Sequence, residues 1–223
     1  MNTKKSTGYN VVTTFVITSQ QAEIGKTTLA LYLSEGLRKL DYTVLLNIRH
    51  QHAEFKWVKK SSPHFAFEHL YISSEQIELL KIRLDQLREN YRYMVVDLEE
   101  GNNQTLGSTL QAADYLIIPT DASLKSLKHV TELVAWIELR PLHANLPCFI
   151  VFNNVSLEMT ALDLDESREI FNDNPNITCL KTILYADNNL KEAFCSEQDI
   201  WQNLEKPHPQ MADLMAEIEL LVA

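Results

Sequence analysis

The 223-residue sequence predicts an α/β fold: a doubly wound, mostly parallel sheet with helices on both faces. Three observations support this class. Short apolar segments alternate with longer segments whose apolar residues recur at helical spacing. The short segments are almost continuously apolar, as expected for strands that are covered on both faces. The composition, 45% hydrophobic and 22% charged, suits a compact globular chain with a substantial core.

The first part of the chain predicts a strand, a short loop and a helix. Residues 11–17 are apolar and β-branched, which is typical of a buried strand. Residues 27–40 place leucines three or four positions apart, which is the spacing of one helix face. The same two patterns predict the next elements, which are strands over 44–46, 70–72 and 93–97 and a helix over 74–90.

The second part of the chain continues this alternation. Apolar runs predict strands over 115–118, 148–152 and 182–184. Amphipathic runs predict helices over 124–139, 161–171 and 211–222. Residues 1–10 are polar and predict a flexible N-terminus, whereas residues 11–223 contain no linker or repeat and predict a single domain. In a parallel sheet of this kind, ligands bind beyond the carboxyl ends of the strands.

Charge and cysteine content exclude several function classes. The formal net charge of −10 argues against nonspecific polyanion binding as the dominant activity. The longest apolar run is shorter than the roughly 20 residues of a membrane-spanning helix, and the first residues lack a secretory signal core. The three cysteines have no paired spacing, which argues against a disulfide framework or a zinc site. A soluble, cytoplasmic protein is expected.

A phosphate-binding loop is predicted between the first strand and the first helix. Gly25-Lys26-Thr27-Thr28 would point backbone N–H groups and the helix dipole at a phosphate. Lys26 would supply an ammonium for the β and γ oxygens, and Thr27 a hydroxyl for magnesium. The full pattern G-x-x-x-x-G-K-[ST] needs a glycine where this chain has Gln20. A helix N-terminus without a ligand is the competing interpretation of the tetrapeptide alone.

A second element strengthens the prediction of a phosphate site. Asp97 ends a predicted buried strand and begins a D-x-x-x-G pattern that reaches Gly101. This arrangement suits the sensing of a γ-phosphate through water, magnesium and a glycine amide. A strand-terminal aspartate can also be only a cap for the following loop. Both elements occur in the order expected for a nucleotide site, which favours the functional interpretation.

Over nearly its whole length the chain resembles the ParA/MinD family of deviant Walker-type P-loop ATPases. The family pattern K-G-G-x-G-K-[ST]-[ST] falls on residues 21–28. Residues 112–120 resemble the family's A-A-D-x-x-[IV]-[IV]-P segment, and residues 151–154 its apolar-Asn strand end. Residues 184–193 occupy the place of a late loop that contacts adenine.

The resemblance implies ATP/ADP and Mg²⁺ as cofactors. It implies catalytic roles for Lys26 and Asp97, and magnesium coordination by Thr27 and Asp97. Asn153 would face the base. The full set of residues implied in nucleotide binding is Gln21, Ile24, Gly25, Lys26, Thr27, Thr28, Pro119 and Asn153.

The departures from the family pattern concern chemistry. The signature lysine that reaches across a dimer is replaced by Gln21, and its two glycines by Ala22 and Glu23. Glutamine has no charge to offer a phosphate. The family's D-x-D-P-Q falls on residues 47–51, Asn47 to Gln51, or one residue later, and neither placement keeps the acids. We therefore expect a retained architecture with impaired hydrolysis.

The leading functional interpretation is a ParA-like ATP-binding protein with weak hydrolysis. It would act as a nucleotide-linked homodimer that partitions or positions a plasmid, DNA or another large cargo through an adaptor protein. One alternative is a pseudo-ATPase interaction module of the same fold. Another is a small-molecule ligase or kinase of the same superfold.

DNA and membranes are two further classes of partner. DNA contact stays open because of the basic residues Lys56, Lys59, Lys60, Lys81, Arg83, Arg88 and Arg92, with Trp57 beside the first three. Membrane binding is not expected, because the amphipathic segment 211–221 is acidic.

Overall fold

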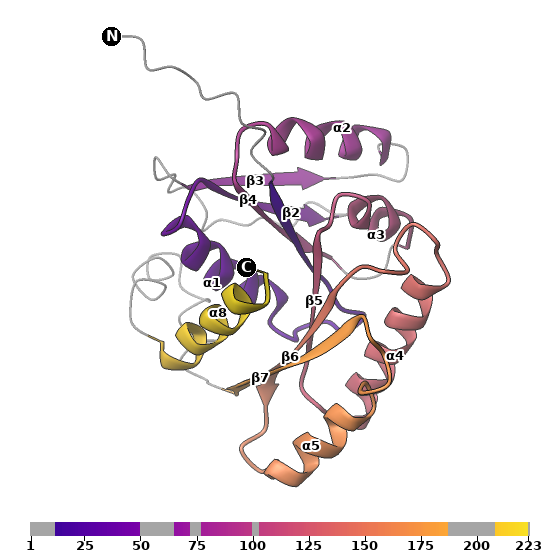
Figure 1. Cartoon of the computed structure of the whole chain (residues 1–223). Helices are drawn as coiled ribbons and strands as arrows, with labels where there is room; N and C mark the ends of the chain where they lie inside the picture. Colours follow the sequence, from indigo (N-terminus) through magenta and orange to yellow (C-terminus); the bar gives the residue numbers. More distant parts are fainter. Residues whose placement is uncertain (1–11, 50–64, 72–76, 100–102, 187–207, 223) are drawn as a thin grey trace.

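The computed structural model describes residues 12–49, 65–71, 77–99, 103–186 and 208–222. Its centre is one sheet of parallel strands in the order β3-β2-β4-β1-β5-β6-β7 (Figure 1). The strands are β1 (Thr13–Ile17), β2 (Thr43–Arg49), β3 (Phe65–Tyr71), β4 (Tyr93–Leu98), β5 (Tyr115–Thr120), β6 (Cys148–Val155) and β7 (Ile177–Tyr185).

Helices cover both faces of this sheet, so the doubly wound architecture is confirmed (Figure 1). The helices are α1 (Lys26–Arg38), α2 (Ile77–Arg88), α3 (Asn103–Leu110), α4 (Leu124–Glu138), α5 (Ala161–Glu169) and α8 (Pro209–Val222). Buried side chains of α1 and α8 form one apolar cluster with the sheet. Buried side chains of α2, α3, α4 and α5 form a second cluster on the opposite face. The two clusters bury the strands from both sides, which explains their nearly continuous apolar sequences.

The centre of the sheet places two strand ends beside the predicted phosphate loop. β1 pairs with β4 on one side and with β5 on the other. Ile17, the last residue of β1, lies opposite Asp97 of β4, and Asp97 also lies opposite Asn47 of β2. Because all these strands are parallel, their carboxyl ends meet at one edge of the sheet. That edge is where this class of fold binds ligands.

Several elements differ from the sequence prediction. The strand predicted over 70–72 is observed as Phe65–Tyr71, and the strand predicted over 182–184 extends over Ile177–Tyr185. Helix α3 was not predicted, because its buried side includes the polar Thr105 and Thr109 beside two leucines. Its hydrophobic periodicity in the sequence is correspondingly weak. The helix predicted over 161–171 ends at Glu169.

The acidic C-terminal helix packs on the body of the fold. Met211, Leu214 and Ile218 of α8 are buried in the cluster that α8 shares with α1. On the neighbouring strand, β7 uses three residues between Cys179 and Ile183 where β6 uses one, which makes a bulge.

Glu217 of α8 fastens the helix to this bulge. Its carboxylate accepts hydrogen bonds from the backbone N–H groups of Lys181 and Thr182, at 2.6 and 3.0 Å, and from the Thr182 hydroxyl at 2.8 Å. The bulge takes these N–H groups out of the regular ladder, so the carboxylate replaces their strand partners. Within the described part of the chain, none of the helices has the length and apolarity needed to cross a membrane.

Candidate phosphate-binding site

The loop between β1 and α1 is seated on the end of β6. Gly25, the residue before α1, has a φ of 83°, in the left-handed region. A Cβ added at Gly25 would lie 2.5 Å from Asn153 Nδ2, which leaves no room for a side chain. The same Nδ2 donates to the Ile24 carbonyl at 2.7 Å. Glycine is therefore required by both the conformation and the close approach of Asn153.

The N-terminus of α1 is arranged to receive an anion. Gly25 provides no side-chain cap, and the first turn of α1 carries no acidic residue. The first N–H groups of a helix have no intrahelical acceptor and carry a partial positive charge. With Lys26 and Thr27 as its first two residues, the helix presents both backbone donors and a cation at one place.

Lys26 is held close beneath the loop. Its side chain is buried, with 6% of the residue exposed, and Nζ donates to the Gln21 carbonyl at 2.9 Å. A buried ammonium is stable only with such partners, because removing a charge from water is costly. The contact fixes the cation next to the N-terminus of α1, as the phosphate-loop prediction requires.

Three side chains converge on one oxygen of Asp97. Asp97 Oδ2 accepts from Thr27 Oγ1 at 2.7 Å, and Asp97 is fully buried at the end of β4. The same oxygen accepts from Asn47 Nδ2 at 2.7 Å and from Arg49 at 2.8 Å. Burial raises the pKa of Asp97 above its usual range, and the Arg49 charge and the Thr27 hydrogen bond oppose that rise.

Arg49 is the functional candidate that sequence reasoning missed. One guanidinium nitrogen of Arg49 donates both to Asp97 Oδ2 and to Thr27 Oγ1, the latter at 2.9 Å. The family pattern indicates only a lost acid at position 49. A usable signal was present, because Asn47 and Arg49 are two residues apart and project from the same face of β2. That face adjoins the end of β4, since the two strands are neighbours in the sheet.

The observed donor set does not fit the magnesium ion that the family resemblance implies. Thr27 Oγ1 and Asp97 Oδ2 are the two oxygens expected to face the metal. Thr27 gives its hydroxyl proton directly to Asp97, and the Arg49 nitrogen lies within 2.9 Å of both oxygens. Magnesium needs oxygen ligands at about 2.0–2.1 Å and would be repelled by a guanidinium at that position. Among the described residues, no group of three or more histidines, cysteines or acids could hold a metal.

Gln21, at the position of the family's signature lysine, is bonded within its own chain. Its amide Nε2 donates to Asp121 Oδ2 at 3.4 Å, and its Oε1 accepts a hydrogen bond from the Ser126 hydroxyl. Burial alone would raise the pKa of Asp121, but hydrogen bonds from Ser126, Ser123 and Gln21 lower it below its usual range. The side chain of Gln21 therefore links the phosphate loop to the start of α4.

The structure thus brings together most of the predicted site residues at one edge of the sheet. Lys26 contacts Gln21, Thr27 contacts Asp97, and Asn153 contacts Ile24. Thr28 lies in the first turn of α1, and Pro119 lies in β5 opposite Val151. Gly101, residues 1–10 and most of the predicted adenine loop lie outside the described residues.

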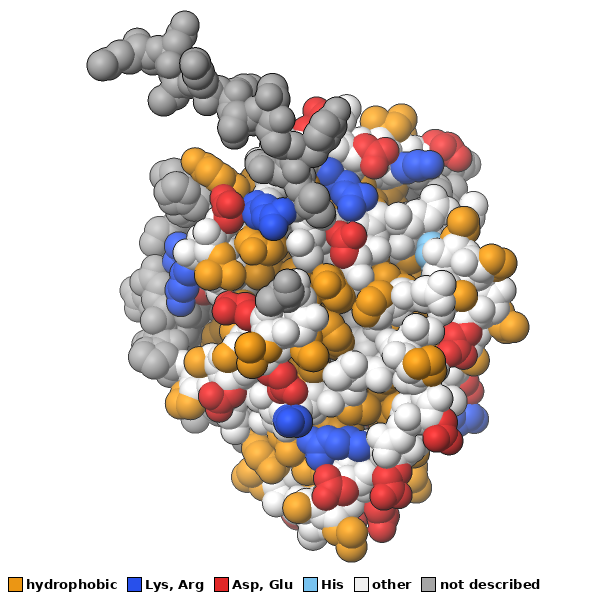
Figure 2. All heavy atoms as spheres, viewed as in Figure 1, with side chains coloured by type: hydrophobic (Ala, Val, Ile, Leu, Met, Phe, Trp, Pro, Cys, Tyr) orange, Lys and Arg blue, Asp and Glu red, His pale blue; other side chains and the backbone are white. Residues whose placement is uncertain are grey.

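The proposed basic surface is only partly described. Lys56, Trp57, Lys59 and Lys60 lie outside the described residues. On the face shown in Figure 2, basic side chains lie among acidic ones. In the described part of the chain, Arg88 pairs with Asp114 at 3.6 Å. These contacts leave the prediction of DNA binding untested.

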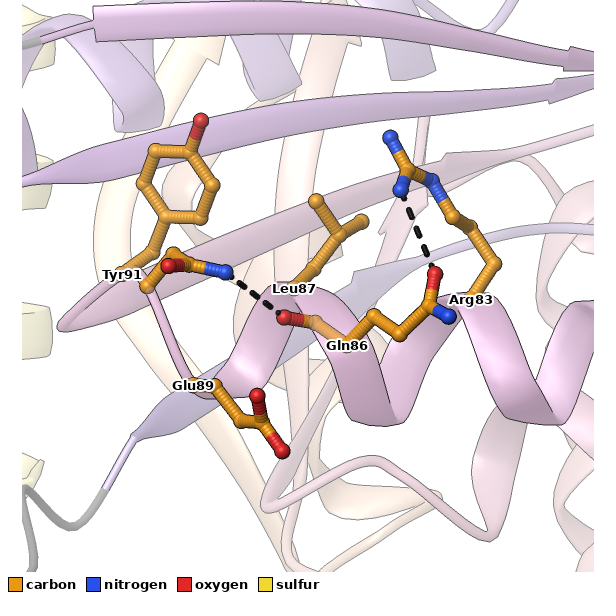
Figure 3. A pocket seen from close by; sticks show the side chains of 6 residues that line it. Arg83, Gln86, Leu87, Glu89 and Tyr91 are labelled. Atoms are coloured by element: carbon orange, nitrogen blue, oxygen red, sulfur yellow. Dashed lines mark hydrogen bonds between the residues drawn. The ribbon is translucent and has the colours of Figure 1, made fainter.

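A surface hollow lies at the C-terminal end of α2 (Figure 3). Its lining includes Arg83, Gln86 and Tyr91, with Arg83 donating to the Gln86 side chain at 3.4 Å. Tyr91 precedes β4, so the hollow lies at the amino ends of the strands. The phosphate loop is at their carboxyl ends, and the hollow is therefore not part of the candidate site.

Comparison with solved structures identifies the fold, whereas comparison of the sequence finds no match. No protein-family model matches the sequence, and no curated protein matches it. The structure is similar to a ParA family ATPase from Chlorobium tepidum, with a TM-score of 0.70, 15% identity, and coverage of 95% of this chain and 98% of that one.

Two further solved structures have the same fold. An Asp-to-Ala variant of McdA from Cyanothece in complex with ATP matches with a TM-score of 0.67 at 17% identity, over 93% of this chain and 96% of that one. The MinC:MinD cell division complex of Aquifex aeolicus matches with a TM-score of 0.66 at 16% identity, over 92% and 96%. The chain therefore has the ParA/MinD type of P-loop fold.

Proposed function

We propose that this chain is a ParA-like nucleotide-binding protein that partitions or positions a large cargo. The observation that carries the proposal is the uncapped N-terminus of α1. There, Gly25 is pressed against Asn153 and Lys26 is held beside the loop. This arrangement supports binding of the phosphates of ATP or ADP by backbone donors and one ammonium. The complex of the McdA variant with ATP supports the choice of nucleotide.

Removal of the loop cation tests nucleotide binding. Lys26→Ala should weaken ATP affinity about 10- to 100-fold, because a charged hydrogen bond to phosphate is lost. Titration calorimetry with ATP and with ADP is the measurement. Lys39→Ala is the matched control, since Lys39 is 63% exposed just after the far end of α1. Equal affinities for wild type and Lys26→Ala would contradict the phosphate-loop assignment.

We propose further that hydrolysis of ATP is slow. The loop has an uncharged Gln21 where the resembling family has lysine, and this amide is engaged by Asp121 and Ser126. Loss of one preorganised charge-stabilising group commonly costs about 10²–10³ in rate. The informative variant is Gln21→Lys with Ala22→Gly and Glu23→Gly, assayed for phosphate release. A wild-type rate equal to that of this triple variant would remove the argument from the missing lysine.

The expected partners follow from the same proposal. We propose a nucleotide-linked homodimer in the cytoplasm that engages an adaptor protein and, through it, a plasmid, DNA or another cargo. The MinC:MinD complex supports a partner protein for this fold. Light scattering with and without ATP tests the dimer. An unchanged monomer mass at saturating ATP would contradict it.

A pseudo-ATPase interaction module is the second candidate function. The contact of Arg49 with both Thr27 Oγ1 and Asp97 Oδ2 favours it, because a metal-dependent reaction would need those two oxygens. Phosphate release below detection by both wild type and the triple loop variant, with ATP still bound, would support this alternative over slow turnover. Measurable release by the wild type would exclude it.

A further inference from the structure

We propose that Arg49 takes the place of a divalent cation, so that this chain binds the polyphosphate group of a nucleotide without magnesium. The inference rests on the proposed nucleotide site at the N-terminus of α1. It changes what that site requires, because the cation is supplied by the chain itself.

The contacts of Arg49 are those expected of a cation shared by two oxygens. One guanidinium nitrogen lies 2.9 Å from Thr27 Oγ1 and 2.8 Å from Asp97 Oδ2. These oxygens come from two different elements, the start of α1 and the end of β4. Arg49 therefore bridges the phosphate loop and the strand-terminal carboxylate, which is the position that the sequence pattern reserves for a metal.

Formal charges support the same assignment. Lys26, Arg49 and Asp97 together carry one net positive charge. With an acid at position 49 the same three positions would carry one net negative charge. The difference of two charges equals the charge of Mg²⁺. The site can thus attract a polyphosphate without an added ion, and it gains less from adding one.

The guanidinium is also fixed in place. The side chain of Arg49 is 10% exposed, and its partner oxygen, Asp97 Oδ2, is also held by Asn47 Nδ2 at 2.7 Å. Arginine stays protonated in proteins and carries five donors in a planar fork that matches phosphate oxygens. A permanent, oriented cation of this kind needs no metal to supply charge to a bound phosphate.

Two oxygens in the same cluster could favour a metal instead. Within the described part of the chain, Asp97 Oδ1 and Asn47 Oδ1 are buried without a hydrogen-bond donor. If nucleotide binding displaced Arg49, these oxygens would be available to a magnesium ion or its waters. The two arrangements make opposite predictions about metal dependence, which can be measured on the unaltered protein.

The decisive experiment is calorimetric titration of the full wild-type chain with ATP, once in EDTA and once in excess Mg²⁺. We expect dissociation constants that agree within about threefold, because the resident cation is present in both. Binding that is more than about tenfold weaker in EDTA would overturn the inference and leave the proposed nucleotide site standing. Absence of binding in both buffers would overturn the proposed function and the inference with it.

An Arg49→Asn variant sharpens the test. Its ATP affinity in EDTA should fall about 10- to 100-fold, and Mg²⁺ should restore part of the loss, because the oxygens are then open to the ion. Arg92→Asn is the matched control, since Arg92 precedes β4 at the opposite edge of the sheet. Unchanged affinity of Arg49→Asn in EDTA would overturn the proposal. Near-UV circular dichroism checks folding, and if the variant does not fold, the wild-type comparison decides.

Discussion

Two carboxylates in this fold accept three hydrogen bonds each, yet they lie in chemically different regions. Asp97, at the carboxyl edge of the sheet, accepts from the side chains of Thr27, Asn47 and Arg49. Glu217, on α8, accepts from two backbone N–H groups and one hydroxyl at the β7 bulge. The number of bonds is the same, but the donors differ, and Asp97 is fully buried whereas Glu217 is only half-buried.

The comparison separates a carboxylate of the candidate site from one that only supports the fold. The backbone donors of Glu217 belong to the bulge, so that acid satisfies groups that the fold leaves exposed. The donors of Asp97 come from side chains of α1 and β2, and one of them is a cation. The contacts of Asp97 depend on particular residues at the carboxyl edge of the sheet, whereas those of Glu217 depend only on the path of the chain.

The largest expected effect comes from breaking the Asp97 cluster. Arg49→Met should destabilise the protein by about 3–5 kcal/mol, because it leaves a fully buried carboxylate without its cation. Urea unfolding is the measurement. The double variant Arg49→Met with Asp97→Asn removes the uncompensated charge and should recover much of the loss. A single-variant loss below about 1 kcal/mol would mean that the ion pair is not buried as described.

Replacing Glu217 at the β7 bulge should have a smaller effect, which should be on stability and not on ATP binding. Glu217→Gln should cost about 1–3 kcal/mol, because one of the two acceptor oxygens at the bulge becomes a donor. Hydrogen exchange should accelerate at the Lys181 and Thr182 amides, while ATP affinity stays unchanged. Glu219→Gln, at an exposed position of the same helix, is the control. Any loss of ATP affinity in Glu217→Gln would contradict the separation of the two regions.

Two glycines give a third test, because replacing each by alanine should change the stability of the protein in opposite directions. Gly25→Ala should cost about 1–2 kcal/mol and weaken ATP binding, because an L residue is strained at a φ of 83° and meets Asn153. Gly107→Ala, inside α3, should instead stabilise by about 0.5–1 kcal/mol, since its Cβ would have 3.6 Å to Trp136. Thermal unfolding of both variants checks the pair. Equal effects would remove the argument for a strained loop.

The smallest effects concern pH. The folded-state pKa of Asp97 is raised by burial, so this carboxyl should cost stability as pH rises from about 4 through its folded pKa. The pKa of Asp121 is lowered by its hydrogen bonds despite burial. Its contribution should therefore be present above about 4 and disappear as pH falls through the folded pKa. Carbon-13 titration of the two carboxyl groups should place them on opposite sides of that value.

Much of the fold was predictable because it follows from hydrophobic pattern. Strands β1 and β5 and helix α4 lie within about two residues of their predicted bounds, since each is strongly apolar or strongly amphipathic. Helix α3 was not predicted, because two of its buried residues, Thr105 and Thr109, count as polar in a sequence. The bulge of β7 was equally invisible, because its stabilising partner Glu217 is about 35 residues away along the chain.

The place of the candidate site in the fold was predictable, and the contacts within it were less so. The loop at 25–28 and the strand-terminal Asp97 were found because local patterns mark both. The role of Arg49 was not found, because it depends on β2 and β4 being neighbours in the sheet, which no local pattern states. The engagement of Gln21 by Asp121 and Ser126 depends on a contact about 100 residues away in sequence.

The central position of β1 has a consequence during synthesis on the ribosome. Thr13 pairs with Tyr93, 80 residues later, and Phe15 pairs with Tyr115, 100 residues later. At about 5–20 residues per second, β1 leaves the exit tunnel roughly 4–20 s before its two neighbours leave it. During that interval an apolar strand has both edges open, which makes the nascent chain a substrate for chaperones and for premature association. The candidate phosphate loop, which begins at the end of β1, cannot take its final form until more than half of the protein has been made.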